Sequence, residues 1–411
     1  MANIEIPLDI QDVKVVEVEI TKRGEIIITV ESTIHGTYCH VCGRKLTKCH
    51  GPDRAITLRH LSILNMKTYI RIRPVRYQCT DCNGKPTTTQ KLPWYDERSP
   101  HTRAYEEHIL LELINNTVED VSIKEKLGYE AVMGIINRHV STEVNWQKIK
   151  RIDILGIDEI SLKKGHKDFV TIVTGRTVDK TMILAVLKDR EKQTVKEFLL
   201  SMPKQLRKSV KAICSDMYEG FINAAKEVFG KKLIVVDRFH VAKLYRNGLE
   251  GLRKKEMRRL KNELSEEEYK KLKGVMWILR KAKSKLMDEE KETLECLFKH
   301  SPLLELAYDF SNDLTDIFEE DISKSKAKRK INNWKKRVKR SDLTCFDGFI
   351  KTLEKSIDEI TNYFIDRQTS GFVEGLNNKI KVIKRRCYGI LNTNHLFQRI
   401  FLDVQGYGLY V

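Results

Sequence analysis

No apolar run in this chain is long enough to cross a membrane, and the first twenty residues lack the basic start and apolar block of a secretory signal peptide. Internal repeats and low-complexity linkers are absent as well. The nine cysteines are an odd number, and four of them form two C-x-x-C pairs, which suits a metal site in a reducing compartment better than a disulfide framework. We therefore expect a cytoplasmic protein with no membrane association.

Acidic residues are scarce relative to basic ones. The 411 residues include 75 Lys and Arg against 57 Asp and Glu, a formal net charge of +18. Such an excess favours a polyanionic partner, because neutralised phosphates release condensed counterions. The alternative is a basic protein with no nucleic-acid role. The length allows two to four domains, and 41% hydrophobic residues support real cores.

The first 140 residues change from a strand pattern to a helical one. Segments 13–20, 25–30 and 68–77 are rich in β-branched and aromatic residues, which predicts a small β module. Residues 103–140 show helical spacing, with Thr117 as a candidate cap and Gly128 as a candidate turn. This pattern predicts a helix-turn-helix whose second helix enters a DNA major groove. A helical hairpin without a DNA role is the alternative.

An α/β pattern begins near Ile152. Three apolar strands (152–158, 168–174 and 181–188) are followed by a helix, a strand ending at Asp216, a second helix and a strand ending at Asp237. This order is that of an RNase H-like domain. A charged, helical stretch then runs to about Phe364 and predicts an all-α insertion, whose charge runs are solvated helix faces unless some contact DNA. A last helix is expected from Ser370 to near Gly389.

The predicted fold class is therefore α/β, with an N-terminal zinc-binding β module, a helix-turn-helix and an all-α insertion. The expected boundaries are 1–98 for the β module, 99–148 for the helix-turn-helix region, 149–243 for the first part of the RNase H-like core, 244–365 for the insertion, and 366–411 for the last helices of the core.

The two C-x-x-C pairs flank strand-like residues and predict one tetrahedral zinc site. Four thiolates leave no open position for substrate, so the zinc is expected to be structural. The alternative is reduced cysteines without a metal. The expected ligands are Cys39, Cys42, Cys79 and Cys82, and nearby competitors for a ligand position are His40, Cys49 and His50.

Three acids form a candidate catalytic site. Asp158 and Asp216 end the first and fourth strands of the α/β region, which are neighbours in an RNase H-like order, and two adjacent carboxylates invite a divalent cation. Glu374 lies on the late helix. Three oxygen donors suit Mg²⁺ or Mn²⁺. Singly, each aspartate is as well explained as a helix cap or a solvated residue. Nearby alternatives are Glu159, Glu219 and Asp237, and Glu159 ranks lower because adjacent strand positions point to opposite faces.

Further residues around these acids are accessory candidates. Asp237 and His240 form an Asp-x-x-His pair that could orient a scissile phosphate or a ligating carboxylate, or simply be a cap beside a partly buried histidine. Basic residues surround Glu374 on its helix and could hold DNA phosphates near the metals. These are Lys379, Lys381, Lys384, Arg385 and Arg386.

The motifs together resemble the insertion-sequence L-three family of bacterial transposases. The matching stretches are YCHVCG with RYQCTDC, ILGIDEISLKKGH, SDMYEGF, VVDRFHV and SGFVEGLNNKIKVIKRRCYG, which follow the family's order over nearly the whole chain. The resemblance implies a zinc-binding domain, a helix-turn-helix, an interrupted RNase H-like domain and catalysis by Asp158, Asp216 and Glu374. Residues 163–166 (KKGH) fit the family motif, and their role does not follow from the residues.

The expected activity is that of a DDE-type transposase. It would bind the terminal inverted repeats of its own insertion sequence, cleave the ends and join the 3′ hydroxyls to target DNA by two-metal phosphoryl transfer. We expect a homo-oligomer, at least a dimer on DNA, because two element ends must be held together, and association with the nucleoid when bound. The alternatives are an RNase H-like nuclease that joins no strands, and a non-catalytic DNA-binding regulator derived from a transposase.

Overall fold

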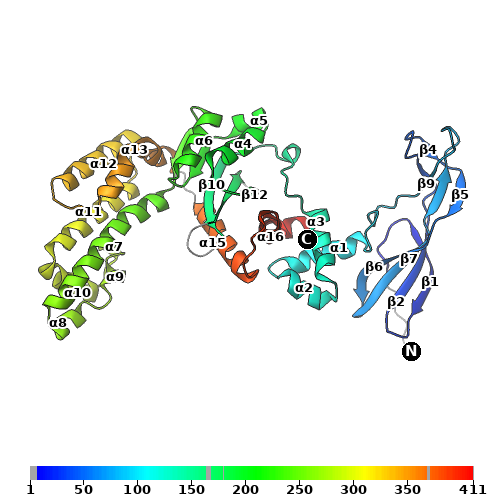
Figure 1. The fold of residues 1–411 in the computed structure, drawn as a ribbon, viewed down its shortest axis with the longest axis horizontal. Helices are drawn as coiled ribbons and strands as arrows, with labels where there is room; N and C mark the ends of the chain where they lie inside the picture. Colours follow the sequence, from blue (N-terminus) through cyan, green and yellow to red (C-terminus); the bar gives the residue numbers. More distant parts are fainter. Residues whose placement is uncertain (1–6, 163–167, 179, 368–370, 411) are drawn as a thin grey trace. The chain divides into compact units, whose positions relative to one another are not determined.

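The computed structural model describes residues 7–162, 168–178, 180–367 and 371–410, with the side chains of 371–374 outside the description. The chain divides into two compact units. Unit 1 comprises Met1–Ser141 with Phe401–Val411, and unit 2 comprises Thr142–Ile400. Figure 1 shows the elements of both units along the chain. Among the described helices, none is both long and apolar enough to span a bilayer.

The β module of unit 1 contains three small sheets. The largest has the order β1-β2-β7-β6, and its strands bury alternate side chains such as Ile28, Val30 and Ile70. A second sheet has the order β5-β8-β9, and β3 pairs with β4. The bounds are β1 Val13–Ile20, β2 Ile26–Ser32, β3 Thr37–Tyr38, β4 Lys45–Leu46, β5 Cys49–Pro52, β6 Ile56–Ile63, β7 Met66–Ile72, β8 Val75–Gln78 and β9 Thr87–Thr89.

Three helices follow the β module: α1 (Arg103–Leu113), α2 (Val118–Glu125) and α3 (Tyr129–His139). Thr117 caps α2 in a reciprocal capping box with Asp120, as its sequence position predicted. The left-handed turn residue between α2 and α3 is Lys126, whereas Gly128 is the N-cap of α3 with an ordinary φ of −66°. The three helices share one apolar core, which Leu402 from the C-terminal segment joins.

Unit 2 is built on a five-stranded sheet of order β12-β11-β10-β13-β14. Its first three strands are antiparallel neighbours, and β10, β13 and β14 run parallel. The bounds are β10 Ile154–Ser161, β11 Phe169–Arg176, β12 Thr181–Leu187, β13 Ala212–Ser215 and β14 Leu233–Val236. Helices α4 (Lys192–Ser201), α5 (Lys204–Ser209) and α6 (Glu219–Phe229) accompany the sheet, as Figure 1 shows, and a short 3₁₀ turn covers Trp146–Lys148.

The insertion after β14 is helical throughout its regular elements, as predicted. It comprises α7 Arg238–Glu263, α8 Glu266–Lys271, α9 Val275–Ile278, a 3₁₀ turn Lys283–Lys285, α10 Asp288–His300, α11 Pro302–Glu319, α12 Lys324–Lys339, α13 Asp347–Thr361 and α14 Tyr363–Asp366. Trp334 lies at its centre, where the indole N–H donates to the Phe310 carbonyl at 2.8 Å. The Asn362 amide donates to the Ile234 carbonyl of β14 at 2.7 Å, which ties the end of the insertion back to the sheet.

The last segment contains several helices, as its expected domain described, and the sequence located only the first of them. Helix α15 (Gly371–Arg386) ends just before Gly389, which has a φ of +91°, and α16 (Thr393–Gln405) and α17 (Tyr407–Tyr410) follow. Ser370, the expected start of this helix, lies outside the described residues. Within unit 1, the carboxylate of Asp403 accepts a hydrogen bond from the Asn115 backbone N–H at 2.9 Å, so residues 401–411 pack with the helix-turn-helix.

Candidate active site and metal centres

Three aspartates lie at one level of the central sheet of unit 2. Ile157 of β10 pairs with Ser215 of β13, which pairs with Val236 of β14. The next residue on each strand is an aspartate: Asp158, Asp216 and Asp237. The sequence predicted that Asp158 ends its strand, and this was wrong, because β10 continues to Ser161. The pairing of β10 with β13 does end at Ile157 and Ser215. Asp158 and Asp216 each follow this last pair, so they lie at the same level of two neighbouring strands.

The first two carboxylates are buried, and each accepts a backbone hydrogen bond. Oδ1 of Asp158 accepts from the Glu159 N–H at 2.7 Å, and Oδ1 of Asp216 accepts from the Tyr218 N–H at 2.9 Å. Asp158 and Asp216 are each 8% exposed. Burial raises the pKa of Asp216 to about 7, and the nearby carboxylate of Asp158 adds to the increase. Burial also raises the pKa of Asp158, against the opposing effect of the His240 imidazole. Two carboxylates with raised pKa values at one point of a sheet favour the binding of a cation that would replace their protons.

Helix α15 reaches this site through Asn377. The amide of Asn377 donates to Oδ2 of Asp158, although the two residues are 219 positions apart in the chain. The Oδ1 atom of Asn377 is buried and has no hydrogen-bond donor within the described part of the chain. Glu374 belongs to the same helix, three residues before Asn377, and its side chain lies outside the described residues. The KKGH motif at 163–166 likewise lies outside them.

The alternative acids have protein partners as well. Asp237 is buried, and its side chain accepts the Phe239 backbone N–H at 3.0 Å, so it caps α7 as one sequence interpretation held. Glu159 accepts a hydrogen bond from Arg190 at 2.8 Å. Glu219 forms an ion pair with Lys355. His240 is half-buried and lies close enough to Asp158 to influence its pKa.

The basic residues of α15 differ in their surroundings. The Lys384 ammonium donates to the Ser161 carbonyl of β10 at 2.5 Å, and burial lowers its pKa. Lys379, Lys381 and Arg385 are exposed, while Arg386 is half-buried. Lys384 therefore holds α15 against the sheet.

The four predicted thiols in unit 1 form a second candidate centre. Their sulfur atoms all lie within 4.8 Å of one another, with Cys39 Sγ 4.0 Å from Cys82 Sγ and Cys42 Sγ 3.8 Å from Cys79 Sγ. A zinc ion held tetrahedrally at about 2.3 Å from each sulfur requires sulfurs roughly 3.8 Å apart. The geometry is therefore compatible with zinc.

Backbone turns shape both halves of the thiol cluster. Gly43, with a φ of +71°, donates to the Cys39 carbonyl at 2.9 Å, and Lys85 donates to the Cys82 carbonyl at 3.1 Å in the second turn. The backbone N–H groups of Cys42 and Val41 lower the pKa of Cys39 to about 7, which favours its thiolate. The competitors are placed elsewhere: the His40 ring bonds to Thr88, and Cys49 and His50 are exposed on β5.

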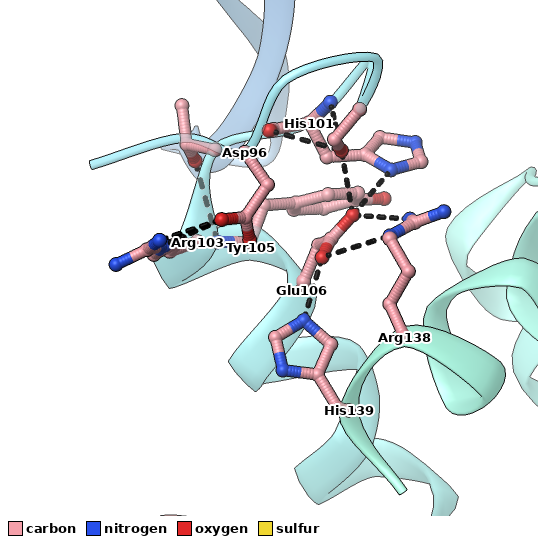
Figure 2. A network of polar contacts seen from close by, with 9 residues as sticks. Asp96, His101, Arg103, Tyr105, Glu106, Arg138 and His139 are labelled. Carbon is pink, nitrogen blue, oxygen red and sulfur yellow. Dashed lines mark hydrogen bonds and ion pairs between the residues drawn. The ribbon is translucent and has the colours of Figure 1, made fainter. Parts of the chain in front are cut away.

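A buried carboxylate in unit 1 forms a further polar cluster. Figure 2 shows Glu106 of α1 enclosed by His101, Arg138 and His139. Ser99 also donates to it, at 2.6 Å. Burial would raise the pKa of Glu106, but the hydrogen bonds from these residues outweigh it and hold the pKa well below its usual range.

The Glu106 cluster has some of the groups of a metal site, because Asp96, Glu106 and His139 bring their ligand atoms within 4.8 Å. However, a guanidinium already occupies the carboxylate of Glu106, and Asp96 pairs with Arg103 at 2.5 Å. A divalent cation would have to displace both arginines. The cluster instead joins the C-terminal end of α3 to α1.

Comparison with known proteins places these features in a known class. Residues 155–400, which include all three candidate acids, match a family model described as a transposase. Residues 90–140, which contain α1 to α3, match the helix-turn-helix domain of transposase family ISL3. The chain belongs to transposase family ISL3, as its motifs indicated.

Named relatives agree with this family. The chain is 23% identical over 377 residues to the transposase for insertion sequence element IS1001 of Bordetella parapertussis, covering 91% of this chain and 90% of the relative. It is 21% identical over 389 residues to the transposase for insertion sequence element IS1557 of Mycobacterium tuberculosis, covering 89% and 86%. Each alignment spans most of both proteins, so the similarity extends beyond a single domain.

Three groups at these sites were not anticipated from the sequence. Asn377 lies in the GLNNK stretch that drew attention to Glu374, and its position one helical turn later could have suggested a role. Arg190 stacks over the Phe169 and Tyr218 rings while it binds Glu159, and nothing in its local sequence indicates this. The local sequence around Glu106 is that of an ordinary amphipathic helix. Its buried position is set by Arg138 and His139 of α3, which contact it only in the folded structure.

Proposed function

We propose that this transposase is a DDE-type enzyme in which Asp158, Asp216 and Glu374 hold two divalent cations, Mg²⁺ or Mn²⁺, within an RNase H-like domain. The single observation that carries the proposal is the position of Asp158 and Asp216, buried and adjacent at the point where β10 and β13 stop pairing. The strand order and the mixture of antiparallel and parallel pairs support the RNase H-like assignment.

The donor set fits divalent cations of the Mg²⁺ type. It consists of carboxylate oxygens, with a buried amide oxygen on Asn377 that has no donor in the described part of the chain. Glu374 precedes Asn377 by three residues, a spacing that places two positions on one helical face. When bound, the cations would activate the attacking oxygen and stabilise the leaving oxygen of an in-line phosphoryl displacement.

The residues of the chain supply the positioning. Asn377 orients Asp158, Lys384 holds α15 against β10, and His240 is available to orient a phosphate near Asp158. Lys379, Lys381, Lys384, Arg385 and Arg386 are the proposed phosphate contacts, although Lys384 also binds the Ser161 carbonyl of β10. The helix-turn-helix would recognise the terminal inverted repeats, and zinc on the four thiols would maintain the β module. At least a dimer would hold two ends together.

The proposed domains keep their boundaries of 1–98, 99–148, 149–243, 244–365 and 366–411, with residues 401–411 docked on the helix-turn-helix.

The reaction would cleave each element end and then join the released 3′ hydroxyl to double-stranded target DNA. The exposed 3′ hydroxyl is the nucleophile of the second step, so no high-energy cofactor is needed.

The decisive experiment is cleavage of a labelled DNA duplex carrying the element end. Asp216→Ala should abolish cleavage with Mg²⁺ and leave end binding, measured by gel shift, nearly intact. Glu219→Gln is the matched control, because Glu219 is a nearby acid already paired with Lys355, and it should cleave at the wild-type rate. Cleavage retained by Asp216→Ala would contradict the proposal.

A second assay separates strand transfer from simple hydrolysis. Pre-cut element ends incubated with target DNA and Mg²⁺ should give joined products on a gel. Cleavage without any joined product would favour the nuclease alternative, which the same acidic site can serve. End binding without cleavage by the purified wild-type protein would favour a DNA-binding regulator.

A further inference from the structure

The helical insertion contains a pocket that the proposed chemistry does not use. It lies between α7 and the segment around α9, with a volume of about 340 Å³. Apolar side chains line part of it, namely Ala242, Leu249, Met276 and Leu279. Four basic residues and a single acid also line it: Lys243, Arg246, Arg253 and Arg280, with Glu250. The pocket therefore combines apolar contact area with an excess of positive charge.

One face of α7 connects this pocket to the acidic site. Phe239, Lys243, Arg246, Glu250 and Arg253 follow one another at intervals of three or four residues, so they form a single stripe on the helix. The stripe begins two residues after Asp237, which caps α7 at the level of Asp158 and Asp216. At 1.5 Å per residue the stripe extends about 21 Å from that point.

The charges at the near end of the stripe are available to a ligand. Lys243 and Arg246 are exposed, and neither forms an ion pair with another described residue. Arg253 is paired with Glu250 at 2.6 Å, farther along the helix. Arg280 lies over the ring of Trp277, 5.0 Å from its centroid, and Trp277 is itself exposed.

The very basic helix α12 provides a contrast within the same insertion. Six of its nine cations are paired with four acids outside α12: Lys324 and Lys328 with Asp358, Lys330 with Glu320, Lys335 and Lys339 with Glu354, and Arg337 with Asp313. Most cations of α12 therefore already have an acidic partner within the insertion. Lys243 and Arg246 on α7 have no such partner among the described residues.

An exposed aromatic ring beside these cations indicates which form of nucleic acid the pocket suits. Phe239 lines the pocket and is 48% exposed, so a ligand in the pocket can reach its ring. A DNA duplex hides the faces of its bases, whereas a single strand offers them to aromatic side chains while its phosphates bind cations. The combination of Phe239, an apolar lining and unpaired Lys243 and Arg246 therefore fits a single strand.

We propose that the α7–α9 pocket binds single-stranded DNA next to the scissile phosphate, with Phe239 stacked on a base and Lys243 and Arg246 on phosphates. The strand would be the one that becomes unpaired at the cleaved end of the element. This inference rests on the proposed function for the identity of the DNA, but the binding site itself is separate from the catalytic acids.

The test uses the full chain, fluorescein-labelled oligo-dT as the probe, a duplex of equal length for comparison, and no added Mg²⁺. Fluorescence anisotropy measures both affinities over a range of salt concentrations. Phe239→Ala should weaken oligo-dT binding by roughly 5- to 140-fold, the range for loss of one stacked base, and change duplex binding less than about two-fold. Lys243→Ala with Arg246→Ala should also reduce the salt dependence for oligo-dT by a slope of about 1.4.

The matched control removes two charges elsewhere on the insertion. Lys326→Ala with Arg329→Ala on α12 deletes two exposed cations and should leave oligo-dT affinity and its salt slope unchanged. Unchanged oligo-dT binding by Phe239→Ala, or an equal loss in the α12 double variant, would overturn the proposal. Equal weakening of duplex and oligo-dT would also overturn it, because the surface would then bind duplex DNA.

Failure of this proposal is distinguishable from failure of the proposed function. Binding is measured without catalytic metal, so it does not depend on cleavage by the acidic site. If the pocket variants bind oligo-dT normally while Asp216→Ala abolishes cleavage, only the single-strand site is wrong. If the pocket variants lose oligo-dT binding but the wild-type protein never cleaves element ends, only the catalytic proposal is wrong.

Discussion

One hydrogen bond joins Asn377 to Asp158 and thereby connects the last long helix of unit 2 to its first strand. A residue that holds a carboxylate in this way acts through the carboxylate, because it limits the directions in which the oxygen atoms can point. The buried Oδ1 of Asn377 strengthens this interpretation, since a polar atom without a donor is costly unless a ligand satisfies it.

Replacing Asn377 by alanine should therefore affect both rate and metal requirement. We expect Asn377→Ala to lower the cleavage rate by about 10- to 100-fold and to raise the Mg²⁺ concentration needed for half-maximal rate. The neighbouring Asn378 is exposed, so Asn378→Ala is the control and should behave like the wild type. A rate loss with an unchanged Mg²⁺ dependence would show that Asn377 does not position a metal-binding carboxylate.

Glu106 illustrates a buried charge that is fully compensated. Four neighbours donate to it, and removal of the carboxylate would leave the Arg138 guanidinium without its partner. We expect Glu106→Gln to lower the free energy of unfolding of unit 1 by about 3 kcal/mol, measured by hydrogen exchange of the α1 amides. Glu107→Gln, which alters the exposed neighbour on the same helix, should change it by less than about 0.5 kcal/mol.

The contribution of Glu106 to the free energy of unfolding should decrease at low pH. Its pKa is held below the unfolded value of about 4.3, so its stabilisation is complete above that pH and is lost as pH falls further. The difference between wild type and Glu106→Gln should therefore decrease as the pH falls from about 4 towards 3. A difference that grows over this acidic range would contradict this account, in which His101, His139, Arg138 and Ser99 all face the carboxylate.

At the level of elements, the two turns that present the four thiols have little secondary structure of their own to hold them together. The strands around them are two to four residues long, too short to form a stable sheet by their own pairing. Arg44 and Asp81 link the two turns at 2.9 Å, but this ion pair is exposed and contributes little. A bound metal would supply the missing stability.

Metal content therefore tests the role of these elements. We expect one zinc per chain by mass spectrometry of the purified protein, and almost none in Cys79→Ser. Cys49→Ser removes an exposed thiol of β5 outside the cluster and should retain the zinc. Zinc lost equally from both variants, or retained by Cys79→Ser, would exclude the four-thiol site. Loss of zinc should unfold the small sheets and leave unit 2 folded, as measured by hydrogen exchange.

At the scale of the whole molecule, the chain folds into two units, and each unit brings together segments that are far apart in the sequence. Unit 1 combines the β module, the helix-turn-helix and the C-terminal residues Phe401–Val411. Unit 2 brings β10, β13 and α15 together across the helical insertion. The basic residues of unit 2 differ in their partners. Six cations of α12 are paired with acids of the insertion, whereas Lys243 and Arg246 of the α7 pocket form no ion pair with another described residue.

Local patterns in the sequence were sufficient for the order of the main elements in the α/β region and for the change from strands to helices in the first 140 residues. They did not locate the short strands of the β module, such as β3, β4 and β5, or the helices α16 and α17. The period of apolar residues distinguished strands from helices, Thr117 marked the start of α2, and the paired cysteines predicted a cluster that the structure assembles. These features depend on residues a few positions apart, where backbone geometry alone relates side chains. The family followed from several such motifs in a particular order.

Only the tertiary structure decided which distant residues meet. It showed that Asp158 lies inside β10 at the end of its pairing with β13, that Asn377 contacts it, and that Glu106 binds the end of α3. It also placed residues 401–411 with the helix-turn-helix. Such contacts depend on the packing of elements separated by long segments, including an insertion of more than a hundred residues, and no local periodicity encodes them. The role of Glu374 in catalysis stays a prediction from its motif.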